Sequence, residues 1–343
     1  MNIFLKRVPL YIVAFASIFS ALISYSFITL SKQGKATTFQ ENATPATVSF
    51  ASSCNVNFSR LSGRKYIKPL LFAERTCEAD KFMTIRNSLS TLINDLKTKG
   101  DINSASVYIR LFQKGEWMSL NDEIKYQPGS LFKVPLLITY LRLAEHDESL
   151  LNKKLLFNQI TTESKGLKQE FVKERIKLGN YYTVKELFRY MIVHSDNNAT
   201  MLLMNNIPFP EFTRTFTDVG LSKDLVNSDA AITAHQYSLF WLALYNGSYL
   251  NFDNSDYALS LLSECDFKEG LLKGIPQDVK VAHKFGEKGD LTNHAFHETG
   301  IVYIHNSPYL ITVMTQGSNQ TKLPNVLKEI SAIVYQNMDG LTN

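Results

Sequence analysis

The sequence predicts an α+β fold, in which one antiparallel sheet is flanked by terminal helices and an all-helical lobe is inserted between its second and third strands. Two strand-like runs near the start of the globular part are followed by a long, mostly helical stretch over about residues 130–265. Three further strand-like runs and an amphipathic helix follow, which gives five strands in all. A cleft between lobe and sheet is then the expected ligand site.

The composition is that of a chain that folds around a hydrophobic core. The 343 residues are 45% hydrophobic and 20% charged, which excludes a disordered protein, a collagen-like fibre and a polytopic membrane protein. Four of the 36 basic residues precede the first acidic one, Glu41, and the remaining 32 equal the acidic residues in number. The globular part is therefore neutral, and we expect no nucleic-acid partner.

The N-terminus contains an uncharged apolar run over residues 8–30. About 20 apolar residues cross a bilayer, so we expect a cytoplasmic tail over 1–7, a transmembrane anchor or uncleaved signal over 8–30 and a polar linker over 31–53. A signal peptide cleaved near Ser24-Tyr25-Ser26 is the alternative. The domain over 54–343 is expected outside the cytoplasm, held at the cell membrane by a single span or secreted.

Three cysteines are present, Cys54, Cys77 and Cys265. An exported domain can form disulfides, and Cys54 with Cys77 would close a loop near its start. Three partly buried free thiols are an equally good interpretation. No Cys or His spacing indicates a metal site, and we expect neither metal nor cofactor.

The elements follow in order from apolar spacing. Phe82, Ile85, Leu89 and Leu92 predict a helix over 80–99 that ends at Gly100. β-rich runs predict strands over 104–112, 117–121, 280–286, 294–305 and 309–317, and a last amphipathic helix is predicted over 323–338.

The first candidate for chemistry is Ser130, which follows a Pro128-Gly129 turn at the start of a strongly apolar helix. Unpaired N–H groups at a helix start favour negative charge on the serine oxygen. Lys133 lies on the same face, and desolvation would favour its neutral form, which can accept the serine proton. Taken alone, an N-cap serine with a lysine reaching solvent explains this pattern more simply. The same Ser-x-x-Lys spacing also occurs from Ser62 to Lys65, but it lies in a hydrophilic loop and we assign no function to it.

Two further motifs follow along the chain. Ser195-Asp196-Asn197 links two helical stretches, where a hydroxyl and an amide can reach a cleft, although such links are often plain helix caps. Lys284-Phe285-Gly286 lies in a strand pattern, where glycine lets a ligand approach the backbone. Ser-x-x-Lys, Ser-Asp-Asn and Lys-x-Gly in this order resemble the class A β-lactamase and penicillin-binding serine hydrolase superfamily over about residues 78–340.

The resemblance implies a role for each matching residue. Ser130 matches the nucleophile, Lys133 the lysine that assists proton removal, and Ser195 the hydroxyl that passes a proton to the leaving nitrogen. Asn197 and Lys284 match groups that bind a substrate carbonyl and carboxylate. Gly286 completes the Lys-x-Gly strand motif. The backbone N–H groups of Ser130 and Glu287 match the oxyanion hole, in which the loss of one donor raises the activation barrier by about 3–4 kcal/mol.

The sequence departs from the family pattern twice. Phe285 replaces a hydroxyl residue that helps to bind the substrate carboxylate, and its bulk is expected to reshape the cleft. Residues 220–233 contain no glutamate to activate the deacylating water; Asp224 and Asp229 are the only acids there.

The resemblance leaves three functions open. The leading one is a class A β-lactamase-like serine hydrolase that forms an acyl-enzyme with β-lactams or related peptide amides. The second is a D-alanyl-D-alanine carboxypeptidase or other cell-wall peptidase, with a peptidoglycan-type peptide as substrate. The third is an inactive domain that binds the cell envelope. In each case a monomer is expected.

Overall fold

The computed structural model describes residues 54–63, 65–160, 171–227, 229–289, 293–304 and 307–342. The predicted tail, anchor and linker over 1–53 lie outside these ranges, so their assignment stays a prediction. Within the described ranges, no helix is both long enough and apolar enough to cross a membrane.

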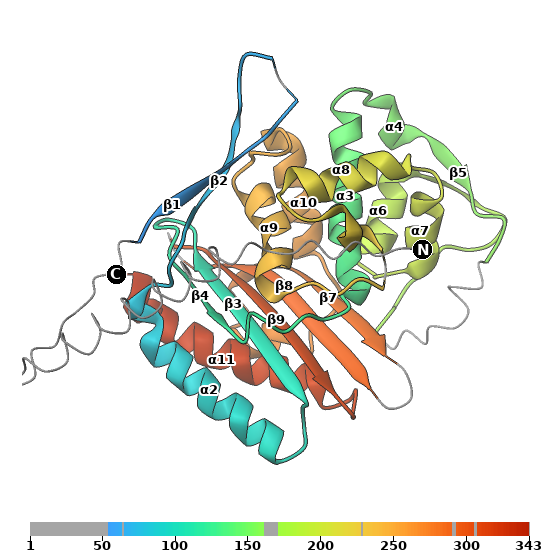
Figure 1. Ribbon diagram of the computed structural model, residues 1–343. Coiled ribbons are helices and arrows are strands. Elements are labelled where there is room, and N and C mark those ends of the chain that lie inside the picture. Colours follow the sequence, from blue (N-terminus) through green and yellow to red (C-terminus); the bar gives the residue numbers. More distant parts are fainter. Residues whose placement is uncertain are drawn as a thin grey trace, which may run out of the picture. The chain divides into compact units, whose positions relative to one another are not determined.

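A five-stranded antiparallel sheet forms the centre of the domain, as predicted (Figure 1). Its order is β4-β3-β9-β8-β7, and every neighbouring pair is antiparallel. The strand that carries the predicted Lys-x-Gly motif, β7, is therefore an edge strand, and β8 is its one strand partner among the described residues. The bounds are β3 Ser104–Leu111, β4 Trp117–Leu120, β7 Lys280–Gly289, β8 His294–Tyr303 and β9 Tyr309–Gly317.

The two terminal helices cover one face of the sheet (Figure 1). They are α2, Met83–Thr98, after a short turn η1, Asp80–Phe82, and α11, Leu323–Thr342. The buried side chains of α2 recur at helical spacing, and they join those of α11 and the sheet in one cluster. The predicted flanking helices are confirmed.

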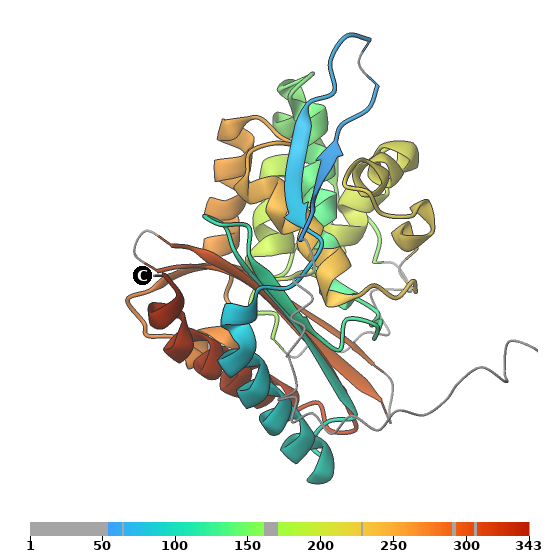
Figure 2. The same ribbon diagram turned by 60° about the vertical axis from the view of Figure 1, so that its left-hand side comes forward.

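The helical lobe lies on the other face and is inserted between β4 and β7, as predicted (Figure 2). Capping boxes at Thr183 and Thr233 fix where α6 and α9 begin, and α9 packs on β3 and β9. The lobe has its own buried cluster. Its helices are α3 Lys133–Ala144, α4 Ser149–Asn152, α6 Val184–Ile192, α7 Asn197–Met204, α8 Phe209–Asp218, α9 Ala234–Tyr245 and α10 Phe252–Ser263, with turns η2 Gly129–Phe132, η3 Lys223–Val226 and η4 Leu271–Gly274.

Two small two-stranded sheets were not predicted. One joins β5, Lys154–Leu156, to β6, Tyr181–Thr183. The other is a hairpin of β1, Val56–Arg60, and β2, Leu70–Arg75. A disulfide between Cys54 and Cys77 closes its base, which decides between the two interpretations of the cysteines, and Cys265 is a buried free thiol.

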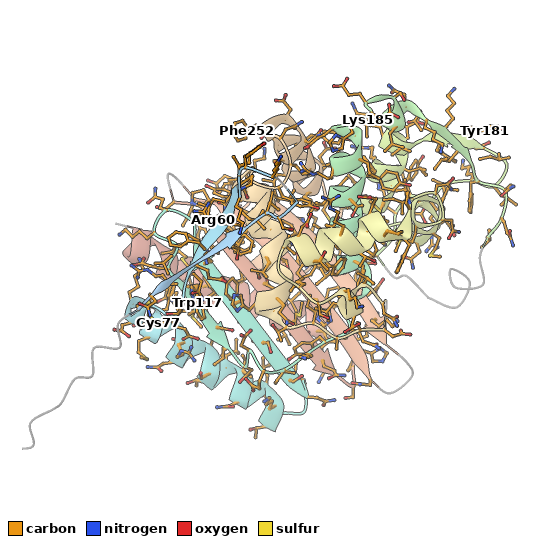
Figure 3. The ribbon with its side chains drawn as sticks, turned by 45° about the horizontal axis from the view of Figure 1, so that its top comes forward. Arg60, Cys77, Trp117, Tyr181, Lys185 and Phe252 are labelled. Atoms are coloured by element: carbon orange, nitrogen blue, oxygen red, sulfur yellow. A yellow bond between two sulfur atoms is a disulfide. The ribbon has the colours of Figure 1, made fainter. Side chains whose placement is uncertain are left out.

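A partly buried polar cluster holds the base of the hairpin against the domain. Glu74 of β2 accepts hydrogen bonds from Tyr108 and Arg110 of β3 and pairs with His235 of α9 at 2.9 Å. The His235 ring stacks on Tyr108 with a centroid distance of 4.7 Å. Trp117 of β4, labelled with Cys77 in Figure 3, donates from its indole N–H to the Arg75 carbonyl. The hairpin is therefore held by its own side chains as well as by the disulfide.

The same cluster makes stability depend on pH. Burial opposes the charge on His235, but hydrogen bonds with Asp122 and Glu74 outweigh burial and raise the pKa of His235 to about 9. Because this pKa is above the unfolded value, the stabilising contribution is complete below about pH 6.5 and is lost as the pH rises through about 9.

We therefore expect the free energy of unfolding to fall by up to about 3 kcal/mol between pH 6.5 and 9. His235→Gln cannot be protonated in this range and should flatten that slope. Urea unfolding at several pH values measures it, and an equally steep slope in the variant would contradict the assignment.

Candidate functional site

Ser130 lies where the sequence places it, at the entrance to α3. It belongs to the 3₁₀ turn η2, directly before Lys133 begins the α-helix. Gly129 has a φ of +54°, which lets the chain turn sharply after Pro128. The serine therefore lies at the N-terminal end of the helix, in the field of its dipole.

The turn that carries Ser130 touches β7 backbone to backbone. A Cβ atom on Gly129 would lie 2.5 Å from the Glu287 carbonyl oxygen, and one on Gly286 would lie 2.5 Å from the Pro128 carbonyl oxygen. Only glycine fits at either position. The contact brings the backbone of Ser130 beside that of Glu287, the two predicted oxyanion-hole residues.

The link between α6 and α7 carries the second hydroxyl. Lys133 Nζ donates to the Ser195 carbonyl at 2.6 Å, to Ser195 Oγ at 3.1 Å and to Asn197 Oδ1 at 2.9 Å. Ser195 has a φ of +58°, an uncommon conformation for a residue other than glycine, asparagine or aspartate. Asp196 holds the link in place by accepting the backbone N–H groups of Asn198 and Ile176, each at 2.9 Å.

Lys284 meets the same hydroxyl from the sheet side. Its Nζ donates to Ser195 Oγ at 2.8 Å and to the Phe285 carbonyl at 3.1 Å. The structure thus brings together the three motifs, although Ser130 and Ser195 are 65 residues apart in the chain and Lys284 follows 89 residues later.

Lys133 and Ser130 do not hydrogen bond to each other in this arrangement of the described residues. The three donors of the Lys133 ammonium are used by Ser195 and Asn197. A neutral amine has two donors and a lone pair, so it must release one of these acceptors. Loss of a proton therefore leaves Lys133 Nζ with a lone pair that is free to accept a hydrogen bond.

Burial and like charge both favour that loss. Desolvation, and next the charge of Lys284, hold the pKa of Lys133 well below its ordinary 10.5. Desolvation also lowers the pKa of Lys284, to about 8. Burial thus makes both lysines that contact the Ser195 hydroxyl lose their protons more readily than an exposed lysine does.

The site is closed in this structure. Ser130 is 8% exposed, Lys133 is 2% exposed, and neither Ser195 nor Lys284 has any exposure. A cavity of about 630 Å³ lies elsewhere, between the hairpin and the helical lobe, and its lining includes none of these four residues. The converging side chains therefore mark the site, although the 630 Å³ cavity lies elsewhere.

Phe285 is a buried residue beside the site. It is 1% exposed, and its ring packs against Phe267 at a centroid distance of 4.5 Å and near Phe171 and Phe296. The alternation of β7 turns Phe285 away from Gly286 and into the core, but its ring still borders the site, because Lys284 Nζ lies 4.1 Å from the ring centroid. Its ring completes the core at the sheet edge.

Neither aspartate of the 220–233 stretch contacts Ser130. Asp229 pairs with Lys288 at 3.2 Å and is 71% exposed, and Asp224 lies within 3.1 Å of the Ser222 hydroxyl. Among the described residues, neither forms a hydrogen bond with Ser130 or Lys133. The arrangement gives no support to either one as a substitute for the missing glutamate.

His297 is a residue of the site that the sequence did not reveal. It is fully buried on β8, its Nδ1 accepts the Thr315 N–H at 3.2 Å, and its Nε2 lies 3.0 Å from the Gln127 carbonyl. The first contact requires the proton to be on Nε2, which then donates to Gln127. Burial lowers the pKa of His297 to about 4, so the ring is neutral at pH 7. It ties the turn that carries Ser130 to the sheet.

No group of three or more His, Cys, Asp or Glu side chains in the described part of the chain could hold a metal ion.

The family profile described as "Beta-lactamase enzyme family" matches residues 86–338, which is well over half of the sequence. The chain belongs to this family. It falls within the superfamily of serine β-lactamases and penicillin-binding proteins. Curated protein sequences gave no match.

Solved structures share the fold of this β-lactamase family member. PBP-A is 19% identical, with a TM-score of 0.62 over 74% of this chain and 96% of that one. A β-lactamase from Xanthomonas campestris is 17% identical, with a TM-score of 0.63 over 74% and 99%. One from Francisella tularensis is 17% identical, with a TM-score of 0.62 over 75% and 99%.

The role of His297 can be tested with His297→Phe, which keeps a ring but leaves the buried Gln127 carbonyl and Thr315 N–H unpaired. Because a small displacement of a reacting group is costly, we expect labelling of Ser130 by a fluorescent penicillin to slow roughly 10²-fold. Stability should fall by about 1–3 kcal/mol for each unpaired group.

His297→Gln can restore both contacts and should recover part of the labelling rate. Tyr126→Phe, which changes the neighbouring ring, is the matched control and should label at a rate close to wild type. If His297→Phe lowers Tm but labels at the wild-type rate, the residue is structural only.

Proposed function

We propose that this protein is a serine hydrolase that forms an acyl-enzyme through Ser130 with β-lactams or related peptide amides. The observation that carries the proposal is the convergence of Lys133 and Lys284 on Ser195 Oγ, at 3.1 and 2.8 Å, beside the turn that holds Ser130. Two lysines with lowered pKa on one hydroxyl provide proton acceptors and donors without a histidine.

In the proposed reaction, Ser130 Oγ attacks the amide carbon and gives its proton to neutral Lys133. The backbone N–H groups of Ser130 and Glu287 receive the developing oxyanion. When the C–N bond breaks, Ser195 Oγ donates its proton to the leaving nitrogen and is reprotonated by Lys133. Asn197 orients a substrate carbonyl, and Lys284, beside Gly286, attracts the substrate carboxylate.

The acyl-enzyme is proposed to be long-lived. Hydrolysis of the ester needs a base that activates water, and neither aspartate of the 220–233 stretch is bound to the nucleophile or its lysine. One of the similar structures is described as an acyl-enzyme complex of a PBP-A mutant with penicillin G. We infer the same first half-reaction here, with slow turnover.

The lack of a water-activating glutamate in residues 220–233 also favours a second candidate, a D-alanyl-D-alanine carboxypeptidase or related cell-wall peptidase. Phe285 argues against it, since it supplies no hydroxyl for a terminal carboxylate and its ring is turned into the core. In either case we propose that the domain acts as a monomer outside the cytoplasm, tethered to the membrane or secreted.

Intact mass followed over time after mixing with benzylpenicillin tests the proposal. We expect an adduct of one penicillin that clears slowly, because no water-activating base is in place. Ser130→Ala should form none. Ser62→Ala removes the serine with the same spacing on the hairpin and should react like wild type.

Equal adducts on wild type and Ser130→Ala would overturn the proposal. If no adduct forms on any variant, the non-enzymatic interpretation gains, and binding of peptidoglycan then tests it. Release of D-alanine from a pentapeptide separates the carboxypeptidase from the β-lactamase-like function.

The pH profile of acylation provides a second test. The rate should rise as Lys133 loses its proton, and should fall above about pH 8 as Lys284 becomes neutral and no longer attracts a carboxylate. Lys284→Arg remains charged and should move the falling limb to higher pH. A limb that stays in place in the variant would exclude Lys284 as its source.

A further inference from the structure

The hairpin carries an excess of positive charge that the rest of the domain lacks. Residues 54–73 contain four basic residues and no acidic one. They are Arg60, Arg64, Lys65 and Lys68. Since the chain after Glu41 carries nearly equal numbers of both signs, the part outside the hairpin has fewer basic than acidic residues.

Exposed apolar side chains gather on the same element. Of the eleven large hydrophobic residues exposed in the described part of the chain, five lie on the hairpin: Val56, Phe58, Tyr66, Ile67 and Leu70. Tyr66 is 85% exposed and Ile67 is 60% exposed, and Lys65 Nζ lies 5.0 Å from the Tyr66 ring centroid. We call residues 60–63 and 65–70 the hairpin tip; on it, exposed apolar side chains lie beside the cations Arg60, Lys65 and Lys68.

We propose that the hairpin tip binds the surface of an anionic lipid bilayer, with Tyr66 and Ile67 at the headgroup level and the basic residues on lipid phosphates. Aromatic and aliphatic side chains beside Lys and Arg are the combination that favours the membrane interface. Each basic residue near an anionic surface adds to the attraction.

The position of the hairpin in the chain supports this occupant. It is the first described element after the apolar run over 8–30, and residues 31–53, even fully extended, reach at most about 80 Å. The Cys54–Cys77 disulfide and the Glu74 cluster hold its base. The tip thus projects from a fixed base, on the far side of the sheet from α2 and α11 (Figures 1 and 2).

A second copy of the chain is a poorer occupant of the same surface. Two hairpin tips facing each other would bring six described cations together without an acidic partner from either tip. Anionic phosphates neutralise the same charge. Phe252, 78% exposed at the start of α10, is labelled at the same end of the molecule and adds apolar area there (Figure 3).

The proposal depends on the proposed location at the membrane and not on the chemistry of Ser130. The test uses the full chain in phosphatidylcholine vesicles with or without phosphatidylglycerol. An environment-sensitive nitrobenzoxadiazole dye is attached to Ile67→Cys. Met83→Cys, 53% exposed on α2, is the matched control. Cys265 is buried and paired cysteines do not react, so unmutated protein reports background labelling.

With phosphatidylglycerol present, the emission of the dye at position 67 should shift to shorter wavelength and be quenched by lipids brominated near the headgroup. The emission of the dye at position 83 should show neither change. Lys65→Glu with Lys68→Glu should abolish the difference between the positions.

Equal quenching at 67 and 83 would overturn the proposal. So would shielding at 67 that does not depend on phosphatidylglycerol and is not quenched by bromolipid, which indicates a second copy or another protein. Penicillin labelling measured in the same vesicles keeps a failure of the hydrolase proposal separate.

Discussion

Two lysine ammonium groups buried around one hydroxyl are the constraint on which the site depends. Charge of the same sign in a dry interior is costly, so both lysines are pushed toward their neutral forms. Hydrogen-bond acceptors around the two lysines offset part of this cost. They are the Ser195 and Phe285 carbonyls and the Asn197 amide oxygen. Ser195 must adopt a left-handed backbone to present both its carbonyl and its hydroxyl, and Asp196 holds it there. The strain is local, and the fixed hydroxyl is its consequence.

The sequence was informative wherever one local rule decided the structure. Apolar spacing located α2 and α11, the β-rich runs located all five strands of the sheet, and Pro128-Gly129 located the turn before α3. The motif order then predicted that Ser130, Lys133, Ser195, Asn197 and Lys284 meet in space. The hydrogen bonds among the last four support that prediction, and their chemical roles remain proposals.

What the sequence did not reveal depends on contacts that are distant along the chain. The β1–β2 hairpin has no clean alternation, because both Leu71 and Phe72 are buried and Phe58 is exposed. The strands β5 and β6 have three residues each, too few for a period. His297 looks like any core histidine until the Gln127 carbonyl and the Thr315 N–H are seen on its two nitrogens. The sequence shows that Phe285 replaces a hydroxyl residue, but only the structure shows that its ring is buried in the core.

The paired glycines at positions 129 and 286 also limit how this enzyme family member can diverge. Neither position has room for a methyl group, so the seam between turn and strand accepts no gradual change. Changes around the proposed site must instead come from neighbouring segments, such as the one from Phe171 to Ile176, which adjoins Phe285 and Asp196. Directed evolution of this protein should therefore leave the seam untouched and randomise that segment.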